Sequence, residues 1–225
     1  MYESKLYRFL RNISRLLGIN KLINTFLDDG YYERKFENAL ESAIKKDAIV
    51  WDVGSNHGLY IDKFLKVLEN QGKILAFEPN KKLHHKLSEK YQDRSNVEIF
   101  GTAVSNFKGE TNFLEGEDDL AATSQIGDPS ANSYKVLVED IKELIERLGA
   151  PDVVKIDIEG AEAQIIDRVG RNITSFENIK FFIEVHFSII ESDHDSDLFY
   201  SNLAHIKSNS KEFQWIDPSH LFFRL

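Results

Sequence analysis

The chain has 225 residues, a formal net charge of −9 and no cysteine. This length suits one α/β domain with extensions, and the negative charge argues against a general nucleic-acid binder, which needs a positive surface. The missing cysteines exclude disulfides, zinc–thiolate sites and cysteine nucleophiles from this chain. Because no apolar run approaches the roughly 20 residues that span a bilayer, we expect no transmembrane segment. We also expect no secretory leader, and therefore a cytoplasmic protein.

The first 46 residues predict helices that precede the sheet. Over residues 6–17, apolar side chains recur at helical spacing, and the same segment contains several arginines. We favour packing of this basic amphipathic helix on its own domain or on a second subunit, which would make a homodimer. Contact with an anionic membrane is the alternative. A second helix is predicted over 31–43. We therefore divide the chain into an N-terminal helical extension, 1–46, and a main domain, 47–225.

An apolar run at residues 49–53 leads into a turn with two glycines, and a helical pattern follows over 59–68. A strand, a tight turn and a helix open a doubly wound α/β domain, whose ligands bind beyond the carboxyl ends of the strands. Gly54 lets the backbone leave the strand at a dihedral closed to other residues, and it lets a ligand approach. Gly58 lies where the helix must pack tightly on the sheet. The other candidate ligand-binding residues of this turn are Asp52, Ser55 and Asn56.

The same turn favours a ligand that carries positive charge. Its spacing is G-x-N-x-G, not the G-x-G-x-x-G of dinucleotide-binding proteins. A diphosphate would bind to free backbone N–H groups with no negative charge nearby, but Asp52 places a carboxylate there. A carboxylate instead suits the sulfonium and ammonium groups of S-adenosylmethionine, which is the cofactor that we predict. The alternative is an ordinary strand–helix turn in which Asn56 caps the helix and nothing binds.

The next predicted strand, 73–77, ends at Glu78 and Pro79. In nucleotide-binding folds, an acidic residue about twenty residues past the glycine turn binds the ribose hydroxyls. A carboxylate suits this role because it accepts both hydroxyl protons. Glu78 and Pro79 are therefore candidate cofactor-binding residues. Asn80 is expected to cap a helix that continues to Tyr91.

Three motifs follow one another along the chain: Asp52-Val53-Gly54-Ser55-Asn56-His57-Gly58, Ala76-Phe77-Glu78-Pro79 and Val154-Lys155-Ile156-Asp157-Ile158-Glu159-Gly160-Ala161-Glu162. Together they resemble the FkbM family of S-adenosylmethionine-dependent methyltransferases, over roughly residues 48–187. The family usually has alanine in place of Ser55 and an apolar residue near His57, so the role of His57 stays open. The resemblance implies a class I methyltransferase fold, which has three α/β/α layers and a Rossmann-like, doubly wound sheet. This sheet is mostly parallel, with a C-terminal antiparallel hairpin.

The segments between these motifs are expected to contact the cofactor and the acceptor. A third strand is predicted over 97–104, and the implied fold places its end beside the adenine ring. Ala103 is therefore a candidate cofactor-binding residue, with an ordinary buried strand end as the alternative. Residues 111–114 are predicted as an extended piece of a short hairpin. The irregular stretch 116–133 is interpreted as a substrate loop or lid, and a mobile surface loop is the alternative.

The strand predicted over 152–159 carries charged side chains on one face. Side chains alternate along a strand, so Lys155, Asp157 and Glu159 should share that face. Burying three charged groups there without partners would be costly. We therefore expect them at the open end of the strand, facing a polar ligand.

The following strand, predicted over 179–187, projects Glu184 and His186 from one face. The fourth and fifth strands are neighbours in the implied sheet, so both side chains should meet Asp157 beside the transferred methyl group. His186 is our first choice as general base for an acceptor hydroxyl, because its intrinsic pKa lies near neutrality. Asp157 would orient the acceptor or contact the cofactor, and Glu184 and Lys155 complete the catalytic candidates. A divalent metal held by these groups is a variant, and a Glu–His pair without function is the alternative.

The predicted function is transfer of a methyl group from S-adenosylmethionine to a hydroxyl group. The resemblance implies O-methylation of a small-molecule acceptor such as a sugar, a glycan or a secondary metabolite. N-methylation of a small molecule and a non-catalytic protein that keeps the cofactor fold are the alternatives. A Rossmann-like oxidoreductase is disfavoured because G-x-G-x-x-G is absent. A helix over 197–208 and two strands, 212–216 and 221–225, should complete the domain.

Overall fold

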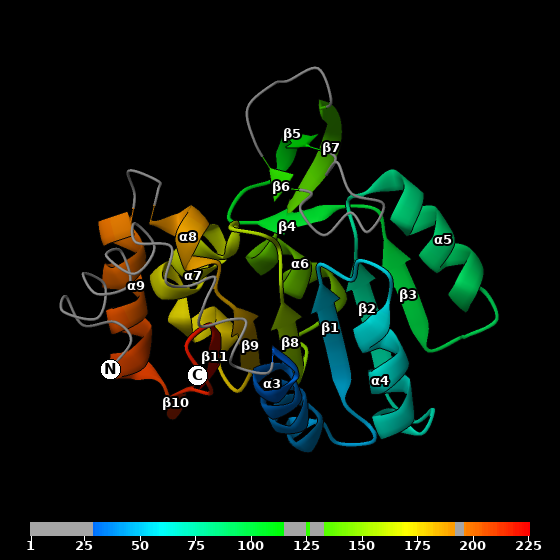
Figure 1. The fold of residues 1–225 in the computed structure, drawn as a ribbon, viewed down its shortest axis with the longest axis horizontal. Helices are drawn as coiled ribbons and strands as arrows, with labels where there is room; N and C mark the ends of the chain where they lie inside the picture. Colours follow the sequence, from blue (N-terminus) through cyan, green and yellow to red (C-terminus); the bar gives the residue numbers. More distant parts are fainter. Residues whose placement is uncertain (1–28, 115–124, 127–132, 192–195) are drawn as a thin grey trace.

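The computed structural model describes residues 29–114, 125–126, 133–191 and 196–225 (Figure 1). Two predictions therefore lie outside the described residues: the basic amphipathic helix, with any dimer formed through it, and nearly all of the substrate loop at 116–133. Within the described ranges, no helix combines the length and the apolar content that crossing a bilayer requires.

Seven strands of the described residues form one sheet, the middle layer of the domain (Figure 1). The strands from β9 to β3 run parallel, and β11 and β10 add an antiparallel hairpin beside β9. This is the doubly wound sheet with a C-terminal hairpin that the sequence predicts. In sheet order the strands are β10 (Glu212–Trp215), β11 (His220–Arg224), β9 (Lys180–Glu184), β8 (Val153–Ile156), β1 (Ile49–Val53), β2 (Lys73–Phe77) and β3 (Val97–Phe100).

Helices cover both faces of this sheet and make the three layers. Along β1, Val50 packs in the apolar cluster beneath α3, α4 and α5, whereas Trp51 packs in the cluster beneath α6, α7 and α9. This alternation is the two-residue period of a strand that is buried on both faces. The helices are α3 (Asp29–Ala43), α4 (Leu59–Leu68), α5 (Lys81–Tyr91), α6 (Ile141–Leu148), α7 (Glu162–Arg171), α8 (Phe187–Ile190) and α9 (Ser196–Asn209), with a short 3₁₀ helix, η1 (Ile173–Phe176).

The elements from α3 to α5 agree with the predicted ones to within two residues at each end. Asn80 caps α5 as predicted, because its side-chain oxygen accepts hydrogen bonds from the backbone N–H groups of Lys82 (3.0 Å) and Leu83 (3.2 Å). α3 falls within the predicted N-terminal extension, yet its Phe36 and Leu40 are fully buried against the sheet. The sheet core therefore includes side chains from before residue 47.

The predicted third strand is wrong, because it is two strands of different sheets. β3 stops at Phe100, and after Gly101 and Thr102 the chain enters β4, so Ala103 lies in a second, four-stranded sheet. This smaller sheet has its own apolar cluster, which includes Phe113 and Val136, and it lies over the carboxyl ends of β1 and β2 (Figure 1). From the sequence, we expect only a short hairpin there. In order, the strands are β4 (Ala103–Ser105), β7 (Ser133–Asp140), β5 (Gly109–Leu114) and β6 (Gln125–Ile126).

Candidate active site

The turn after β1 has the tight geometry that its glycines predict. Gly54 has a φ of +80°, and a Cβ atom there would lie 1.8 Å from the backbone oxygen of Asp157. Gly58 has a φ of +79°, and its Cβ would lie 2.8 Å from the side chains of Leu87 and Tyr91. The buried Ser55 hydroxyl donates a hydrogen bond to the Asp52 carbonyl (2.9 Å) and closes the turn. The turn is therefore locked against the neighbouring strand β8 and helix α5.

Gly54→Ala is expected to destabilise the fold by about 3 kcal/mol, which urea unfolding would measure. The left-handed φ accounts for about 1 kcal/mol, and the clash with backbone of the neighbouring strand end adds about 2 kcal/mol. Gly149→Ala is the matched control, because Gly149 also has a positive φ (+89°) but would meet nothing within 4 Å. Equal losses in the two variants would contradict the proposed clash.

Glu78 closes over the same turn from the end of β2. One carboxylate oxygen accepts the backbone N–H of Asn56 and the other accepts the N–H of Asn80, both at 2.8 Å. Burial raises the pKa of Glu78 to about 7, although these two hydrogen bonds act to lower it. Each oxygen keeps a second lone pair for a ligand hydroxyl. Pro79 follows, half-buried, and the side-chain oxygen of Asn56 is buried with no hydrogen-bond partner among the described residues.

Asp52 and Lys155 form a buried ion pair between β1 and β8. The two residues are opposite one another in the strand register, and the Lys155 Nζ atom lies 3.3 Å from Asp52 Oδ1 and 3.6 Å from Asp157 Oδ2. Nζ also donates to the Gly54 carbonyl (3.0 Å), and the ring of Tyr60 lies 4.8 Å away. Burial opposes the charge, but the two carboxylates raise the pKa of Lys155, which stays protonated. Asp52 thus has an ammonium partner within the chain, and its contact with a cofactor stays a prediction.

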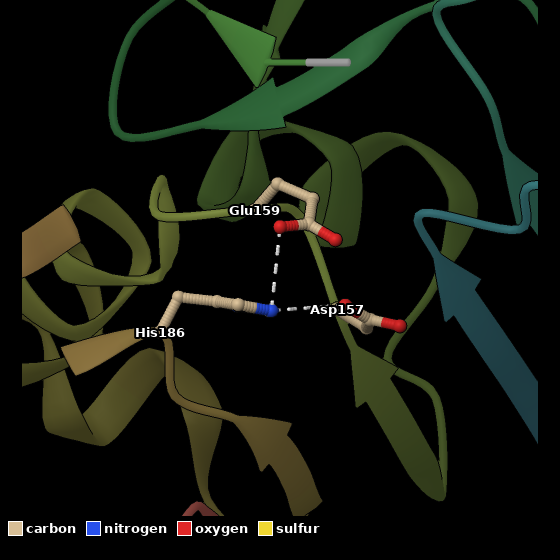
Figure 2. Close-up of side chains that lie close together, drawn as sticks. All are labelled: Asp157, Glu159 and His186. Atoms are coloured by element: carbon tan, nitrogen blue, oxygen red, sulfur yellow. Dashed lines mark ion pairs between the residues drawn. The ribbon is translucent and has the colours of Figure 1, made fainter. Parts of the chain in front are cut away.

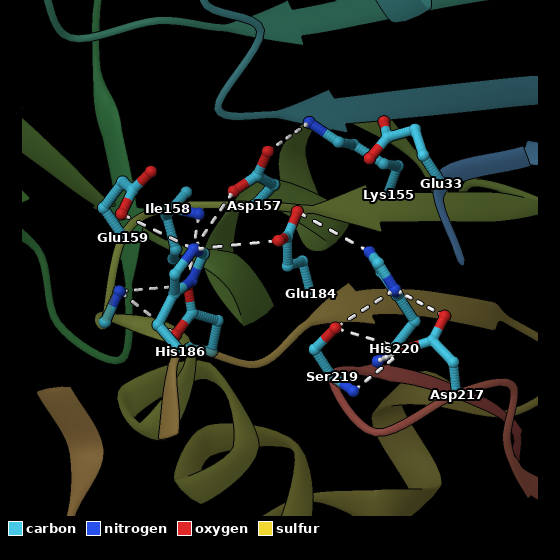
Figure 3. Close-up of polar contacts among 12 residues, drawn as sticks. Glu33, Lys155, Asp157, Ile158, Glu159, Glu184, His186, Asp217, Ser219 and His220 are labelled. Atoms are coloured by element: carbon cyan, nitrogen blue, oxygen red, sulfur yellow. Dashed lines mark hydrogen bonds and ion pairs between the residues drawn. The ribbon is translucent and has the colours of Figure 1, made fainter. Parts of the chain in front are cut away.

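His186 lies among four carboxylates at the carboxyl edge of the sheet (Figures 2 and 3). Its Nδ1 atom lies 2.9 Å from Glu162 Oε1. Its Nε2 atom lies 3.5 Å from Glu159 Oε2 and 4.0 Å from both Asp157 Oδ1 and Glu184 Oε1. The structure therefore brings together Asp157, Glu184 and His186, as the sequence analysis expects, and it adds two glutamates to them.

The strands that carry these residues are shorter than predicted. β8 stops at Ile156 and β9 stops at Glu184, so strand alternation does not govern the residues that follow. Glu159 has a φ of +52° and Gly160 a φ of +100°, and these left-handed conformations turn the chain back toward the sheet. His186 directly precedes α8, a short helix that the sequence does not predict. The side chains converge through turns at the strand ends.

Glu162 fixes the orientation of the His186 ring. Its side chain has no exposed surface, and Oε1 also accepts the backbone N–H groups of Ile158 (3.2 Å) and Gly160 (3.1 Å). Because a carboxylate only accepts, Nδ1 of His186 carries the hydrogen and Nε2 faces the other three carboxylates. In the sequence, Glu162 appears only as the last residue of the third motif, at 154–162. An acidic residue in the first turn of a helix is the available signal, but its partner His186 lies 24 residues later in the chain, beyond another strand.

The carboxylates change the charge state of His186. Burial by itself would lower the pKa of the imidazole, but the hydrogen bond that Nδ1 donates to Glu162 and the charges of Glu162, Glu159 and Asp157 raise it to about 9. Burial raises the pKa of Glu159 to about 7, partly opposed by His186. At neutral pH the resting site therefore contains an imidazolium ion beside a carboxyl group that titrates close to neutrality.

Asp157, Glu159 and His186 each offer one atom that could bind a metal, and these atoms lie within 4.8 Å of one another (Figure 2). Two carboxylate oxygens and an imidazole nitrogen suit a divalent cation such as Mg²⁺ or Mn²⁺. Acidic groups at protein surfaces often lie this close without an ion, so the metal variant stays a prediction.

The Methyltransferase FkbM domain family matches residues 52–210. The chain belongs to the FkbM methyltransferase family. This FkbM protein is similar to the hexuronic acid methyltransferase AglP of Haloferax volcanii, with 26% identity over 158 residues. The match covers 68% of this chain and 62% of that relative, so the chain spans about six-tenths of the relative's length.

A solved structure shares the fold of this FkbM protein. A putative rRNA methylase from Clostridium thermocellum superposes with a TM-score of 0.51 at 8% identity, over 83% of this chain and 90% of that one. The fibrillarin–Nop5p complex gives a TM-score of 0.47 at 15% identity, over 80% and 72% of the two chains. The predicted class I methyltransferase fold, with three layers and a mostly parallel sheet, is confirmed. At such identities the likeness concerns the fold alone.

Proposed function

We propose that this FkbM protein transfers a methyl group from S-adenosylmethionine to a hydroxyl of a small-molecule acceptor. One observation carries the proposal: the glycine turn after β1, Glu78 after β2 and the carboxylate-bound His186 after β9 lie along one edge of the same sheet, and only β8 separates β9 from β1. A donor seated on the turn would therefore have an acid–base group within its reach. The name of the relative, a hexuronic acid methyltransferase, supports a sugar or glycan as the acceptor.

The turn residues suit S-adenosylmethionine. The free lone pairs of Glu78 can accept the ribose hydroxyls, and the unpartnered buried oxygen of Asn56 can accept a donor group of the ligand, since leaving it unpaired is costly. The negative charges of this edge suit a sulfonium and an ammonium group. The other residues that we assign to this ligand are Asp52, Gly54, Ser55, Gly58, Pro79, Ala103 and Asp157.

S-adenosylmethionine, when bound, supplies a methyl group on a positively charged sulfur atom. Nε2 of His186 takes the acceptor's hydroxyl proton while the oxygen–carbon bond forms and the carbon–sulfur bond breaks, so the proton ends on the imidazole and the sulfur becomes a neutral thioether. Glu162 keeps Nδ1 protonated and thereby makes Nε2 the base. Asp157 and Glu184 stabilise the imidazolium that results. The donor's positive charge opposes a charged imidazole, so binding the donor favours the neutral ring that the reaction needs.

Glu78→Gln is expected to weaken S-adenosylmethionine binding about tenfold, because an amide accepts hydroxyl protons less well than a carboxylate. Isothermal titration calorimetry of the full chain would measure the dissociation constant. Glu98→Gln is the matched control, a half-exposed glutamate on the next strand that pairs with Lys73. Equal affinity for S-adenosylmethionine and NAD, or no affinity for either, would refute the cofactor assignment.

The reaction itself is tested by methyl transfer from labelled S-adenosylmethionine to a panel of neutral sugars, uronic acids and amines. Label in a hydroxyl-bearing product supports the proposal, and label only in amines makes the protein an N-methyltransferase. Binding of the donor without transfer to any member of a broad panel would favour a non-catalytic protein. Adding EDTA and then Mg²⁺ or Mn²⁺ to the same assay decides whether a metal takes part.

A further inference from the structure

Glu184 lies between two imidazole rings (Figure 3). Its Oε1 atom lies 4.0 Å from Nε2 of His186, and its Oε2 atom lies 3.7 Å from Nε2 of His220. His220 begins β11 and is directly opposite Glu184 in the register of β11 and β9. Each carboxylate oxygen therefore faces a different histidine, and one of these histidines plays no part in the mechanism given above.

His220 is held rigidly on the side away from Glu184. Its Nδ1 atom lies 2.7 Å from Asp217 Oδ2, and Asp217 Oδ1 accepts the backbone N–H groups of Ser219 (2.9 Å) and His220 (3.0 Å). The ring of Phe36 stacks on the imidazole with 4.2 Å between centroids. The side chains of His220 and Asp217 are 5% and 1% exposed. The Nε2 atom of His220 consequently points at Glu184 in one fixed orientation.

The charge of His220 is also fixed. Burial alone would lower its pKa, but the carboxylates of Asp217 and Glu184 raise the pKa to about 9, so the ring is a cation at neutral pH. Burial alone would raise the pKa of Glu184, but the hydrogen bond and charge of His220, together with the charges of His186 and Lys155, lower it, so Glu184 stays ionised. The other charged groups around Glu184 are His186, Lys155, Asp157 and Glu159. His186 thus pairs with Oε1 of Glu184, and His220 pairs with Oε2.

We propose that His220, anchored by Asp217, is a positioning residue that holds the Glu184 carboxylate against His186 during methyl transfer. The inference rests on the proposed function. Glu184 is one-third exposed, so without His220 its long side chain would gain rotamers that point into water. Partners of this kind, one step removed from the reacting group, orient the groups that react. Both Asp217 and His220 lie outside residues 52–210, which match the family.

The test is a double-mutant cycle on kcat with His220→Gln, Glu184→Gln and the double variant. Each single change should lower kcat about tenfold and leave the dissociation constant of S-adenosylmethionine within about twofold, because neither side chain is assigned to the donor. The double variant should be no slower than Glu184→Gln alone, since His220 acts through Glu184. Losses that multiply to about a hundredfold would overturn the proposal. His205→Gln, an exposed histidine on α9, is the control and should leave kcat unchanged.

A readout that needs no turnover separates this inference from the proposed function. The imidazole ¹⁵N signals of His186 should differ between the wild-type protein and His220→Gln. They should not differ between Glu184→Gln and the double variant. Circular dichroism shows whether each variant is folded. If the unchanged protein transfers no methyl group, the proposed function fails, while the coupled shifts still decide the positioning role. An unchanged His186 signal in a folded His220→Gln protein would refute it.

Discussion

His186→Ala is expected to lower kcat by about 10²- to 10⁴-fold, the range over which a positioned general base contributes. Nε2 of His186 is the atom left to accept a proton, because Glu162 holds Nδ1 at 2.9 Å. The dissociation constant of S-adenosylmethionine should not rise, since the turn with Glu78 lies on other strands and the substitution removes a cation that opposes the donor's charge. Initial-rate assays with labelled S-adenosylmethionine measure kcat, and calorimetry measures the dissociation constant. His205→Ala is the control, and a full-speed His186→Ala enzyme with intact donor binding would remove the base from the mechanism.

The pH dependence of kcat and kcat/KM of the wild-type enzyme should report the titration of His186. The pKa of His186 is raised to about 9, so the ring is protonated and inactive below that pH. kcat/KM, which reports the free protein, should therefore rise about tenfold per pH unit and level off near pH 9. kcat should level off at lower pH, because the donor's positive charge lowers the pKa of the imidazole. For stability the sign is opposite: protonated His186 stabilises the fold below about pH 6.5, and this contribution is lost as the pH rises through about 9.

Lys155→Met should lower the free energy of unfolding by about 3–5 kcal/mol, because it leaves the Asp52 carboxylate buried without its cation. Asp52 has no exposed side-chain surface, and Lys155 has 3%. Adding Asp52→Asn to Lys155→Met should recover much of the loss, since position 52 would no longer carry a buried charge and Asp157 would keep His186 as its cation. Urea unfolding measures the free energies of unfolding of the wild-type protein, Lys155→Met and the double variant.

Lys180→Met provides the comparison for this ion pair. Lys180 is also a strand lysine, but its Nζ donates to the backbone carbonyl of Ala43 (2.7 Å), a neutral partner. Losing that hydrogen bond should cost about 1 kcal/mol. A Lys155→Met protein that is no less stable than Lys180→Met would show that the buried pair adds little to the fold.

The first two strand–helix units could be predicted closely because their signals are local. Gly54 can adopt the positive φ with which the chain leaves the first strand. Asn80 follows the second strand and caps the next helix with its own side chain. The predicted third strand failed because nothing in residues 97–104 distinguishes one continuous strand from two that a bend at Gly101 sends into different sheets. That distinction depends on β7, about thirty residues later in the chain.

Three residues of the candidate site could be predicted from the sequence, but the geometry of the site could not. Asp157, Glu184 and His186 are recognisable as charged residues near strand ends, and the parallel order of β8 and β9 brings them together. Glu159 reaches His186 only through a left-handed turn, which is uncommon for glutamate and has no clear sequence signal. His220 reaches Glu184 only because β11 inserts beside β9, a pairing between residues 36 positions apart. Such contacts depend on tertiary structure, which hydrophobic periodicity does not specify.

The smaller sheet has a consequence for how the family could diversify. It branches off after β3 and returns at α6, and its interior is an apolar cluster of its own, with Phe113, Val136 and Val138 buried in it. Substitutions on its outer faces therefore need no repacking of the layers below. The strands beyond β4 could therefore be exchanged as a unit, and under the proposed function acceptor preference could change there while Ala103, the glycine turn and His186 remain as they are.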